Sequence, residues 1–137
     1  MVLFPFHSFN IFQKEVKNNL ITELPYIGKE YKISFEILIT KFGSDPYQSV
    51  LHFGLGGNAE KYGDRAPAVW MTKDKYLLVA SSISGNKNHY YISQMDLKEN
   101  KWIKIELSQT LTDGKAGIQD YIFSFHCNQE YLIIVSF

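Results

Sequence analysis

The residues best suited to binding chemistry lie in a glycine-rich segment, GLGGNAEKYGDRAP at 54–67. It contains Arg65, the only arginine of the chain, whose planar guanidinium can bind a carboxylate or several carbonyl groups in a way that a lysine cannot. Asn58, Tyr62 and Asp64 are close to it in the sequence. We predict that these four residues form the rim of a polar ligand site. The simpler alternative is that Asp64 and Arg65 hold a long loop together from within, with Tyr62 packed over it.

Two further patterns in this segment are weaker. Residues 54–59 have the G-x-G-x-x-A spacing of a dinucleotide-binding turn, but a glycine and a proline soon afterwards interrupt the helix that such a turn needs. Asn58, Glu60 and Asp64 could offer oxygen ligands to calcium, although their spacing does not fit a D-x-D-x-D-G calcium loop. The histidines are scattered, and the single cysteine cannot form a pair, which disfavours zinc. We therefore predict neither a metal site nor a cofactor, with calcium as the alternative left open.

A second polar cluster follows at GNKNHYY, residues 85–91. Amide side chains can hydrogen-bond to the hydroxyl groups of a sugar, and aromatic rings can stack on its apolar face. We predict Asn86, Asn88 and Tyr90 as further ligand-binding residues. An ordinary turn followed by half-buried tyrosines is the alternative.

The carboxylates that could support catalysis are Glu36 and Glu106, because glycoside hydrolysis needs two carboxyl groups about 5–9 Å apart on one face. Each has a lysine nearby on the same predicted strand face, so ion pairs on a solvated surface explain them adequately. His126 and Cys127 are adjacent, and adjacent strand residues point to opposite faces, so they do not form a catalytic pair. We predict no catalytic residue and no enzymatic activity. A glycoside-active enzyme of the glucanase type that uses the two glutamates is the alternative.

The composition excludes several classes of protein. The 137 residues carry 14 basic and 14 acidic side chains, and this net charge of zero offers nothing to attract nucleic acid or an anionic membrane. A single cysteine excludes an internal disulfide, and no stretch approaches the roughly 18 apolar residues of a membrane span. Phe, Tyr and Trp are numerous, with 10, 9 and 2 copies, which favours β-sheets over packed helices. These numbers predict one all-β domain.

Alternation of apolar and polar residues predicts the strands. Between 31 and 39 apolar side chains fall on every second position, which is the period of a strand with one buried face. Clusters of Gly, Asn, Asp and Pro separate such segments about every 8 to 14 residues. The expected strands are 31–39, 49–54, 68–72, 76–83, 89–95, 102–108, 121–125 and 131–137. Helical spacing appears only at 8–24, where we predict a short helix. The whole pattern predicts an antiparallel β-sandwich or jelly roll.

Several segments resemble a known family: GKEYKISFEI, SVLHFGLGG, KYGDRAPAVW, SSISGNKNHYYIS and NKWIKIELSQTL. Together they are similar to the concanavalin A-like (laminin-G/jelly-roll) β-sandwich domains found in cnidarian extracellular proteins. The most specific element is KYGDR-x-P at 61–67. The resemblance implies two curved antiparallel sheets and a non-enzymatic binding or adhesion module whose ligand is a carbohydrate or a protein; a purely structural module is a further alternative. It also implies an extracellular location, although residues 1–12 do not read as a secretory signal peptide.

The resemblance covers 24–115 and sets the predicted domain boundaries. We expect an atypical N-terminal segment at 1–23 and a single β-sandwich domain at 24–137, with a divergent tail at 116–137. Members of the family continue into further strands, so the resemblance implies that C-terminal strands are missing here. A sheet edge left open in this way can pair with another chain, which predicts self-association.

Overall fold

The computed structural model describes residues 29–58, 60–83, 85–93, 95–112, 120–127 and 130–136. Within these residues every regular element is a β-strand, which confirms the predicted all-β class. The strands are β1 (Tyr31–Leu38), β2 (Tyr47–His52), β3 (Ala68–Thr72), β4 (Leu77–Ile83), β5 (Asn86–Ile92), β6 (Trp102–Thr112), β7 (Asp120–Cys127) and β8 (Glu130–Ser136). The predicted helix at 8–24 and the N-terminal segment 1–23 lie outside the described residues.

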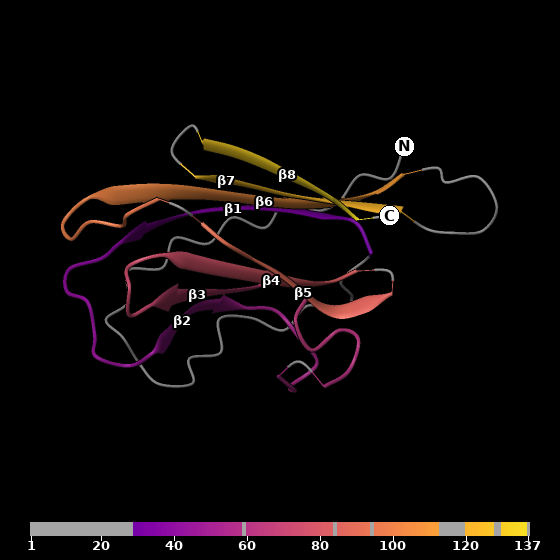
Figure 1. Ribbon diagram of the computed structural model, residues 1–137, viewed down its shortest axis with the longest axis horizontal. Helices are drawn as coiled ribbons and strands as arrows, with labels where there is room; N and C mark the ends of the chain where they lie inside the picture. The colour runs from indigo at the N-terminus through magenta and orange to yellow at the C-terminus, as the bar shows by residue number, and fades with distance from the viewer. Residues whose placement is uncertain are drawn as a thin grey trace.

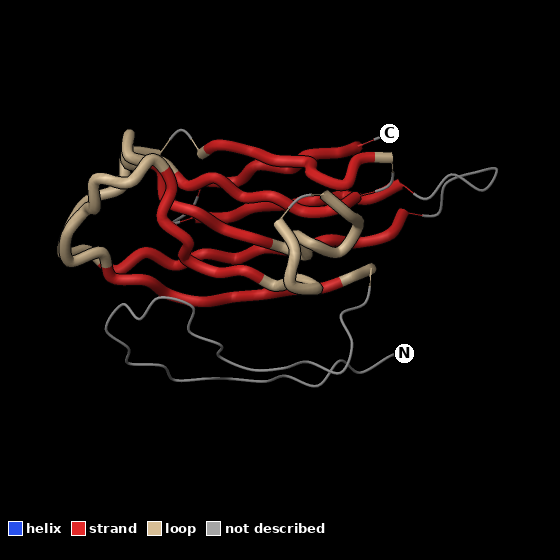
Figure 2. The backbone as a smooth tube through the Cα atoms, turned by 90° about the horizontal axis from the view of Figure 1, so that it is seen from below, coloured by secondary structure: helices blue, strands red, loops and turns tan. Residues whose placement is uncertain are grey.

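The strands form two antiparallel sheets of four strands each. One sheet has the order β1-β6-β7-β8 and the other β2-β3-β4-β5. Figure 1 shows the two sheets as layers, one above the other, and Figure 2 shows that the strands run along the long axis of the molecule. The long strand β6 lies inside its sheet, because it pairs with β1 on one side and with β7 on the other. Within the described part of the chain, β1 and β8 are the edges of one sheet, and β2 and β5 are the edges of the other.

The apolar core lies between the layers and follows from the alternation in the sequence. In β1 the side chains of Ile33, Phe35 and Ile37 are less exposed than their neighbours, as the period of two predicts. β6 repeats the pattern with fully buried residues, and β3 and β4 contribute side chains from the other layer. The buried members of the core are Ile39, Val69, Met71, Leu77, Val79, Leu97, Ile103, Ile105 and Leu107. Removal of these side chains from water is the main force that holds the two sheets together.

A small polar network also joins the two sheets. Tyr31 of β1 donates its hydroxyl to the Oε1 atom of Gln109 on β6 at 3.1 Å, and its oxygen lies 2.7 Å from the hydroxyl oxygen of Ser81 on β4. Ser81 donates to the same Gln109 oxygen at 2.7 Å, and the Gln109 amide donates to the carbonyl oxygen of Lys29 at 2.9 Å. Ser81 and Gln109 are only 0% and 4% exposed. Buried polar groups of this kind are tolerated because each finds a partner, and they fix how the sheets align.

Folding is expected to weaken as the pH rises above about 10, because of Tyr31. Burial raises the pKa of its hydroxyl above the ordinary value of 10.0, and the hydrogen bond with Ser81 lowers the pKa to a smaller extent. The neutral form is therefore favoured in the folded state. The buried Tyr31 hydroxyl therefore contributes fully to the free energy of unfolding when the pH is below the pKa that this group has in the unfolded chain. The contribution declines as the pH rises above that value. Urea unfolding at a series of alkaline pH values measures this decline. Tyr31→Phe, which cannot ionise, is expected to show a shallower decline, and equal slopes for the two proteins would contradict the interpretation.

The predicted strand boundaries are right at 68–72 and wrong around the β4–β5 hairpin. We expected a turn at 84–88 and a strand at 89–95, but β5 begins at Asn86. The reason is a tighter turn, in which Gly85 has a φ of +73° and Ile83 pairs directly with Asn86. A glycine adopts such a positive φ without strain, and short hairpin connections depend on it. The polar residues around 86–88 therefore belong to a strand, where their side chains have fixed directions.

Candidate functional site

The loop that joins β2 to β3, residues 53–67, folds back on the outer side of the β2-β3-β4-β5 sheet (Figures 1 and 2). At its base the N–H of Phe53 donates to the carbonyl oxygen of Pro67 at 2.9 Å, which continues the pairing of the two strands. Farther along, the N–H of Ser82 on β4 donates to the carbonyl oxygen of Arg65 at 2.8 Å. These backbone bonds tie the loop to the sheet and hold it in one path.

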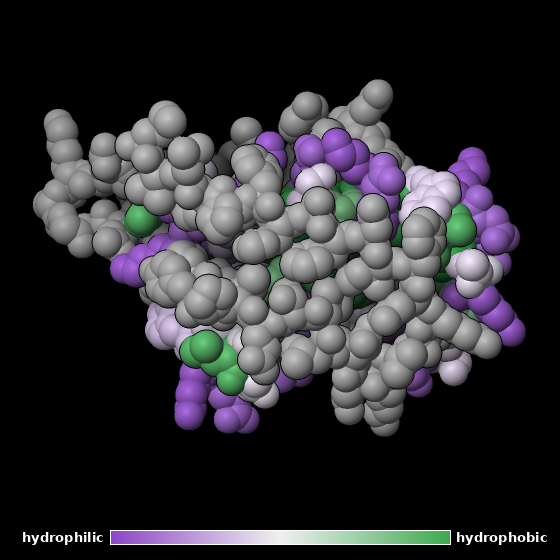
Figure 3. All heavy atoms as spheres, turned by 180° about the vertical axis from the view of Figure 1, so that it is seen from behind, coloured by the Kyte–Doolittle hydropathy of each residue, from purple (hydrophilic) through white to green (hydrophobic). Residues whose placement is uncertain are grey.

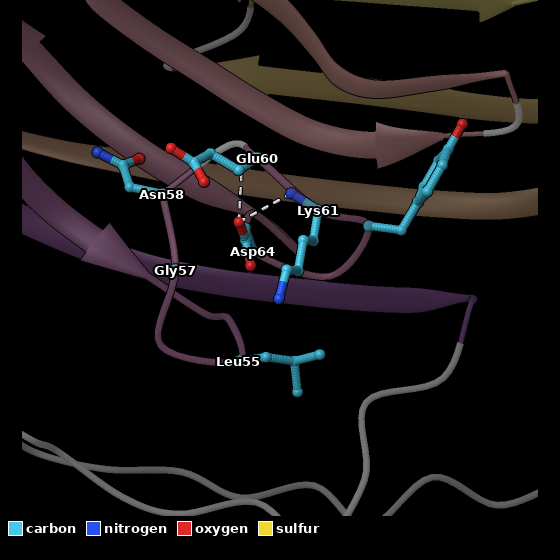
Figure 4. A pocket seen from close by; sticks show the side chains of 7 residues that line it. Leu55, Gly57, Asn58, Glu60, Lys61 and Asp64 are labelled. Carbon is cyan, nitrogen blue, oxygen red and sulfur yellow. Dashed lines mark hydrogen bonds between the residues drawn. The ribbon is translucent and has the colours of Figure 1, made fainter.

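Asp64 organises the loop from within. Its carboxylate is 4% exposed, and its Oδ2 atom accepts hydrogen bonds from the backbone N–H groups of Glu60 and Lys61, both at 3.0 Å (Figure 4). Gly57 allows the carboxylate to come this close, because a Cβ atom at that position would be 2.5 Å from both carboxylate oxygens. The ring Nε2–H of His52 donates to the backbone oxygen of Asp64 at 2.6 Å. The alternative in which Asp64 is an internal anchor of the loop agrees with these contacts.

Arg65 lies at the centre of a second group of contacts, which we call the Arg65 cluster: Asn58, Arg65, Trp70 and Asn88. The Nε and Nη2 groups of Arg65 donate to the Oδ1 atom of Asn58 at 2.9 and 2.7 Å, and Nη1 donates to the Oδ1 atom of Asn88. The guanidinium carbon is 4.6 Å from the centre of the Trp70 ring, which is cation–π geometry. His52 packs edge-on against the same ring, with the two centres 5.9 Å apart. The cluster thus joins the loop to β3 and β5.

Two alanines under the cluster explain how Arg65 crosses the sheet. Trp70 is on β3 and Asn88 on β5, and β4 lies between these two strands, which puts them roughly 10 Å apart at the usual strand spacing. Ala80 of β4 lies between them on the outward face, because its neighbours Val79 and Ser81 point into the core. Ala80 and its register partner Ala68 are nevertheless 0% exposed. Small side chains at these two positions leave room above this part of the sheet, which agrees with an Arg65 side chain that reaches from Trp70 to Asn88.

The structure brings some of the predicted binding residues together and separates others. Asn58, Arg65 and Asn88, which are far apart in the chain, are joined by hydrogen bonds. Tyr90 lies two residues beyond Asn88 on β5, so it is on the same face, and it is 58% exposed. Asn86 is exposed at the start of the strand, where its Oδ1 atom accepts the N–H of Asn88 at 2.9 Å.

Tyr62 and Trp70 differ from what the sequence suggested. Tyr62 is 58% exposed, so it covers the loop less than the anchoring alternative expects. Trp70, which the sequence analysis did not include, supplies the surface on which Arg65 rests. Trp70 could have been found from the alternation in β3, which places it on the face opposite to the buried residues Val69 and Met71. An aromatic residue on the outward face of a buried strand needs something to cover it.

The loop also encloses an open hollow of about 530 Å³. Its lining includes three of the predicted site residues, and the full set is Leu55, Gly57, Asn58, Glu60, Lys61, Tyr62 and Asp64 (Figure 4). Two of the three side chains that we considered for calcium are already engaged, because Asn58 accepts from Arg65 and the Asp64 Oδ2 atom accepts from two backbone amides, whereas the Glu60 side chain is exposed. Within the described residues, no three His, Cys, Asp or Glu side chains lie close enough together to hold a metal ion. Calcium at this place would have to compete with these hydrogen bonds.

The two glutamates of the enzymatic alternative lie on the outer face of the other sheet. Glu36 is opposite Lys104 in the register of β1 and β6. Lys104 forms an ion pair with Glu106 at 2.9 Å, and Ser34 donates its hydroxyl to the same Glu106 oxygen at 3.5 Å. Glu106, through its hydrogen bond and charge, and Glu36, through its charge, raise the pKa of the exposed Lys104 ammonium. This arrangement is an ion-pair surface, as the sequence suggested, and the enzymatic alternative stays an untested prediction.

Replacing Arg65 with lysine is expected to lower the free energy of unfolding by about 1 kcal/mol, even though the charge is kept. A lysine cannot donate to Asn58 and Asn88 at the same time or stack a flat group on Trp70. Most of this surface is partly solvated, which limits the effect. The measurement is chemical unfolding, with Lys32→Arg as a control on the exposed face of β1. If the two substitutions had the same small effect, the cluster would not contribute to stability.

Exposed apolar side chains of the described residues are spread over both sheets and the loop. The large ones are Leu38, Tyr47, Leu55, Tyr62, Tyr90, Ile92 and Trp102. Among the described residues visible in Figure 3, the hydrophobic atoms appear in a few separate areas. The described part of the chain has no helix with the length and apolar character needed to cross a membrane. Among the described residues, the Arg65 cluster with Tyr90 beside it combines fixed polar groups with exposed aromatic surface.

Comparisons with protein-family models, with curated proteins and with solved structures find no match for the chain. The resemblance to concanavalin A-like domains consequently rests on the sequence segments quoted above. What the structure adds is an all-β chain with two four-stranded antiparallel sheets. Family membership and function follow from these observations only as proposals.

Proposed function

We propose that the chain is a non-enzymatic binding or adhesion module with a β-sandwich architecture of the concanavalin A-like, jelly-roll type. Two layered antiparallel sheets with a shared apolar core support the sandwich. The similarity over 24–115 supports the family, and with it an extracellular location. The proposed ligand is a carbohydrate or a protein.

The observation that carries this function is the Arg65 cluster with the exposed ring of Tyr90 next to it. Asn58 and Asn88 hold the guanidinium in place, and Trp70 supports it from one side. Binding sites generally combine a few fixed polar groups, which orient the ligand, with aromatic surface, which supplies contact area. The cluster has both, on rigid strands and on a loop that the sheet holds in place. We place the binding site on this outer face of the β2-β3-β4-β5 sheet.

A thermal melt of the protein with a panel of glycans tests this assignment, because a ligand that binds only the folded state raises the melting midpoint. Tyr90→Ala is expected to reduce the shift. Trp102→Ala removes an aromatic side chain of similar exposure, 60% against 58%, from the other sheet and is expected to leave the shift unchanged. Equal shifts in both variants would place the site elsewhere. A panel in which no glycan moves the midpoint would reject the carbohydrate ligand and leave a protein ligand to be tested.

Self-association through an open sheet edge is part of the same proposal. β8 is the last strand of its sheet within the described residues, and β1 is at the opposite edge. Edge strands carry unpaired backbone groups that can pair with a second chain. Sedimentation equilibrium measures the outcome, and a monomer at all accessible concentrations would contradict it.

A further inference from the structure

The charge on Arg65 has no acidic partner among the described residues. The acceptors of its hydrogen bonds are the neutral amide oxygens of Asn58 and Asn88. Asp64 is its neighbour in the chain, but the buried Asp64 carboxylate is bound to the loop backbone at Glu60 and Lys61. A guanidinium is usually matched by a carboxylate when a protein removes it from water. Here the geometry holds the group firmly and leaves its charge without an ion pair.

Counting the N–H groups shows what the guanidinium still offers. Arginine has five, one on Nε and two on each terminal nitrogen. The Nε group and one Nη2 group donate to Asn58, and one Nη1 group donates to Asn88. One N–H group therefore remains on each terminal nitrogen. Both lie in the plane of the guanidinium, and each can donate to a carboxylate oxygen.

The electrostatics agree with this count. Burial lowers the pKa of Arg65 below its ordinary value, and this effect exceeds the opposite effect of the Asp64 charge. The partly buried surroundings of Arg65 therefore favour the cation slightly less than water does. A bound anion would favour the charged form and add an ion pair to the hydrogen bonds that Asn58 and Asn88 already accept.

Tyr90 indicates which kind of anion fits. Its side chain lies on the same outward face as Asn88, and in the register it stands opposite Ala80, one of the two alanines under the cluster. Its ring is 58% exposed, and Ile92, the next outward residue of β5, is 44% exposed. A flat, exposed ring beside an orienting polar group suits the apolar face of a sugar ring, which stacks on aromatic side chains. A carboxylate recognised by Arg65 and a ring recognised by Tyr90 are both present in one unit of an acidic sugar.

We propose that the outer face formed by the Arg65 cluster and Tyr90 binds a glycan that contains uronic acid, with the carboxylate on Arg65 and the sugar ring on Tyr90. This inference rests on the proposed binding function and narrows its ligand to a carboxylated carbohydrate. The acid group provides orientation and charge, and the aromatic ring provides contact area. Neutral sugars lack the first of these interactions.

Calorimetric titration with unsulfated uronate oligosaccharides tests the proposal. The set contains oligomers of galacturonan, hyaluronan and alginate, and the matched control is the methyl ester of each galacturonan oligomer, which keeps the backbone and removes the charge. We expect at least one uronate oligomer to bind, and we expect the esterified form to bind about tenfold more weakly or worse if galacturonan is that ligand. Binding is also expected to weaken with added salt. If no uronate oligomer binds, the proposal is wrong.

Asn88→Asp is the most informative variant. It keeps the size of the side chain and the oxygen that accepts from Arg65, but it places a carboxylate beside the guanidinium. Arg65 then has an internal ion pair, so uronate binding is expected to fall by about tenfold or more, while the melting midpoint stays at or above that of the wild type. Tyr90→Ala is expected to weaken binding severalfold through loss of the ring, and it provides a second test if Asn88→Asp fails to fold. Trp102→Ala on the opposite sheet is expected to bind as the wild type does.

The outcomes separate this inference from the proposed function. If neutral glycans bind as tightly as uronates and Asn88→Asp has no effect on binding, the proposal of an acidic ligand is wrong, while the proposed binding function stands. Failure of every glycan, neutral and acidic, would reject both this inference and the carbohydrate ligand of the proposed function. If polyglutamate competes with the uronate oligomers for binding as well as they compete with one another, and if it also loses binding in Asn88→Asp, the site binds acidic peptides. The proposal of a sugar ligand would then be wrong.

Discussion

Replacing Ile105 with alanine is expected to lower the free energy of unfolding by about 3–4 kcal/mol. Ile105 is 0% exposed and lies in the middle of β6, opposite Phe35 of β1 and Cys127 of β7. It belongs to the core cluster between the two sheets. Truncation there removes apolar contacts and leaves a cavity that strands on both sides of β6 prevent from closing. Urea unfolding followed by tryptophan fluorescence measures the change.

Two substitutions on β6 serve as controls for this experiment. Ile105→Val removes one methyl group at the same place and is expected to lower the free energy of unfolding by about 1 kcal/mol. Thr110→Ala changes an exposed residue of the same strand, and an effect below about 0.5 kcal/mol is expected. If Ile105→Ala were as mild as Thr110→Ala, the two sheets would not share the tightly packed core described above.

Replacing Asp64 with alanine is expected to lower the free energy of unfolding by about 2–4 kcal/mol. The substitution leaves the N–H groups of Glu60 and Lys61 without the buried carboxylate that now accepts from both. Water can enter the open hollow beside the loop, so part of the loss is recovered there. Amide hydrogen exchange at these two residues is expected to become faster, because the turn they form has lost its anchor.

Glu60→Ala is the matched control, since it removes a carboxylate from an exposed position in the same loop. It is expected to change the free energy of unfolding by less than about 0.5 kcal/mol. Gly57→Ala disturbs the same interaction in another way, because the added Cβ would collide with the Asp64 carboxylate. This variant is expected to destabilise the loop as well. If Asp64→Ala and Glu60→Ala had equal effects, Asp64 would not be the internal anchor.

Much of the fold could be predicted from the sequence, because the hydrophobic pattern and the burial agree. The period of two in β1 predicts which of its residues face the core, and β3 begins and ends where expected. The β4–β5 hairpin was less predictable. Two asparagines and a lysine read as a turn, yet the backbone at Gly85 closes the hairpin earlier and draws them into β5. Local polarity did not decide this boundary, since an edge strand accepts polar residues on its outer face.

The candidate site was predictable residue by residue but not as a geometry. Arg65 was identified because a guanidinium is the best carboxylate and carbonyl ligand in the sequence. Its link to Asn88 spans 23 positions and depends on the register of β3, β4 and β5. Trp70 was missed for the same reason, because its contact with Arg65 exists only once the loop folds back over the sheet. Long-range contacts of this kind are set by the tertiary fold and leave little trace in local spacing.

The proposed function depends on one feature of this fold: a loop that is fixed from within by Asp64 presents Arg65 on a flat strand surface. The loop has an internal carboxylate anchor, and the sheet has two alanines that make room for the side chain. A site built on such fixed elements is already arranged before the ligand arrives, which reduces the entropy lost on binding. Stability of the loop and affinity for the ligand are therefore expected to fall together in Asp64→Ala.

The most direct test of a binding site at the Arg65 cluster is an NMR titration of the isotopically labelled protein with the glycan that gives the largest shift in melting midpoint. We expect the amide and side-chain signals that move to belong to the loop at 53–67 and to β5, with the Arg65 Nε–H and the Asn58 and Asn88 side-chain amides among them. Signals that move instead on β1 and β6, around Glu36 and Glu106, would contradict it and favour the glycoside-active alternative.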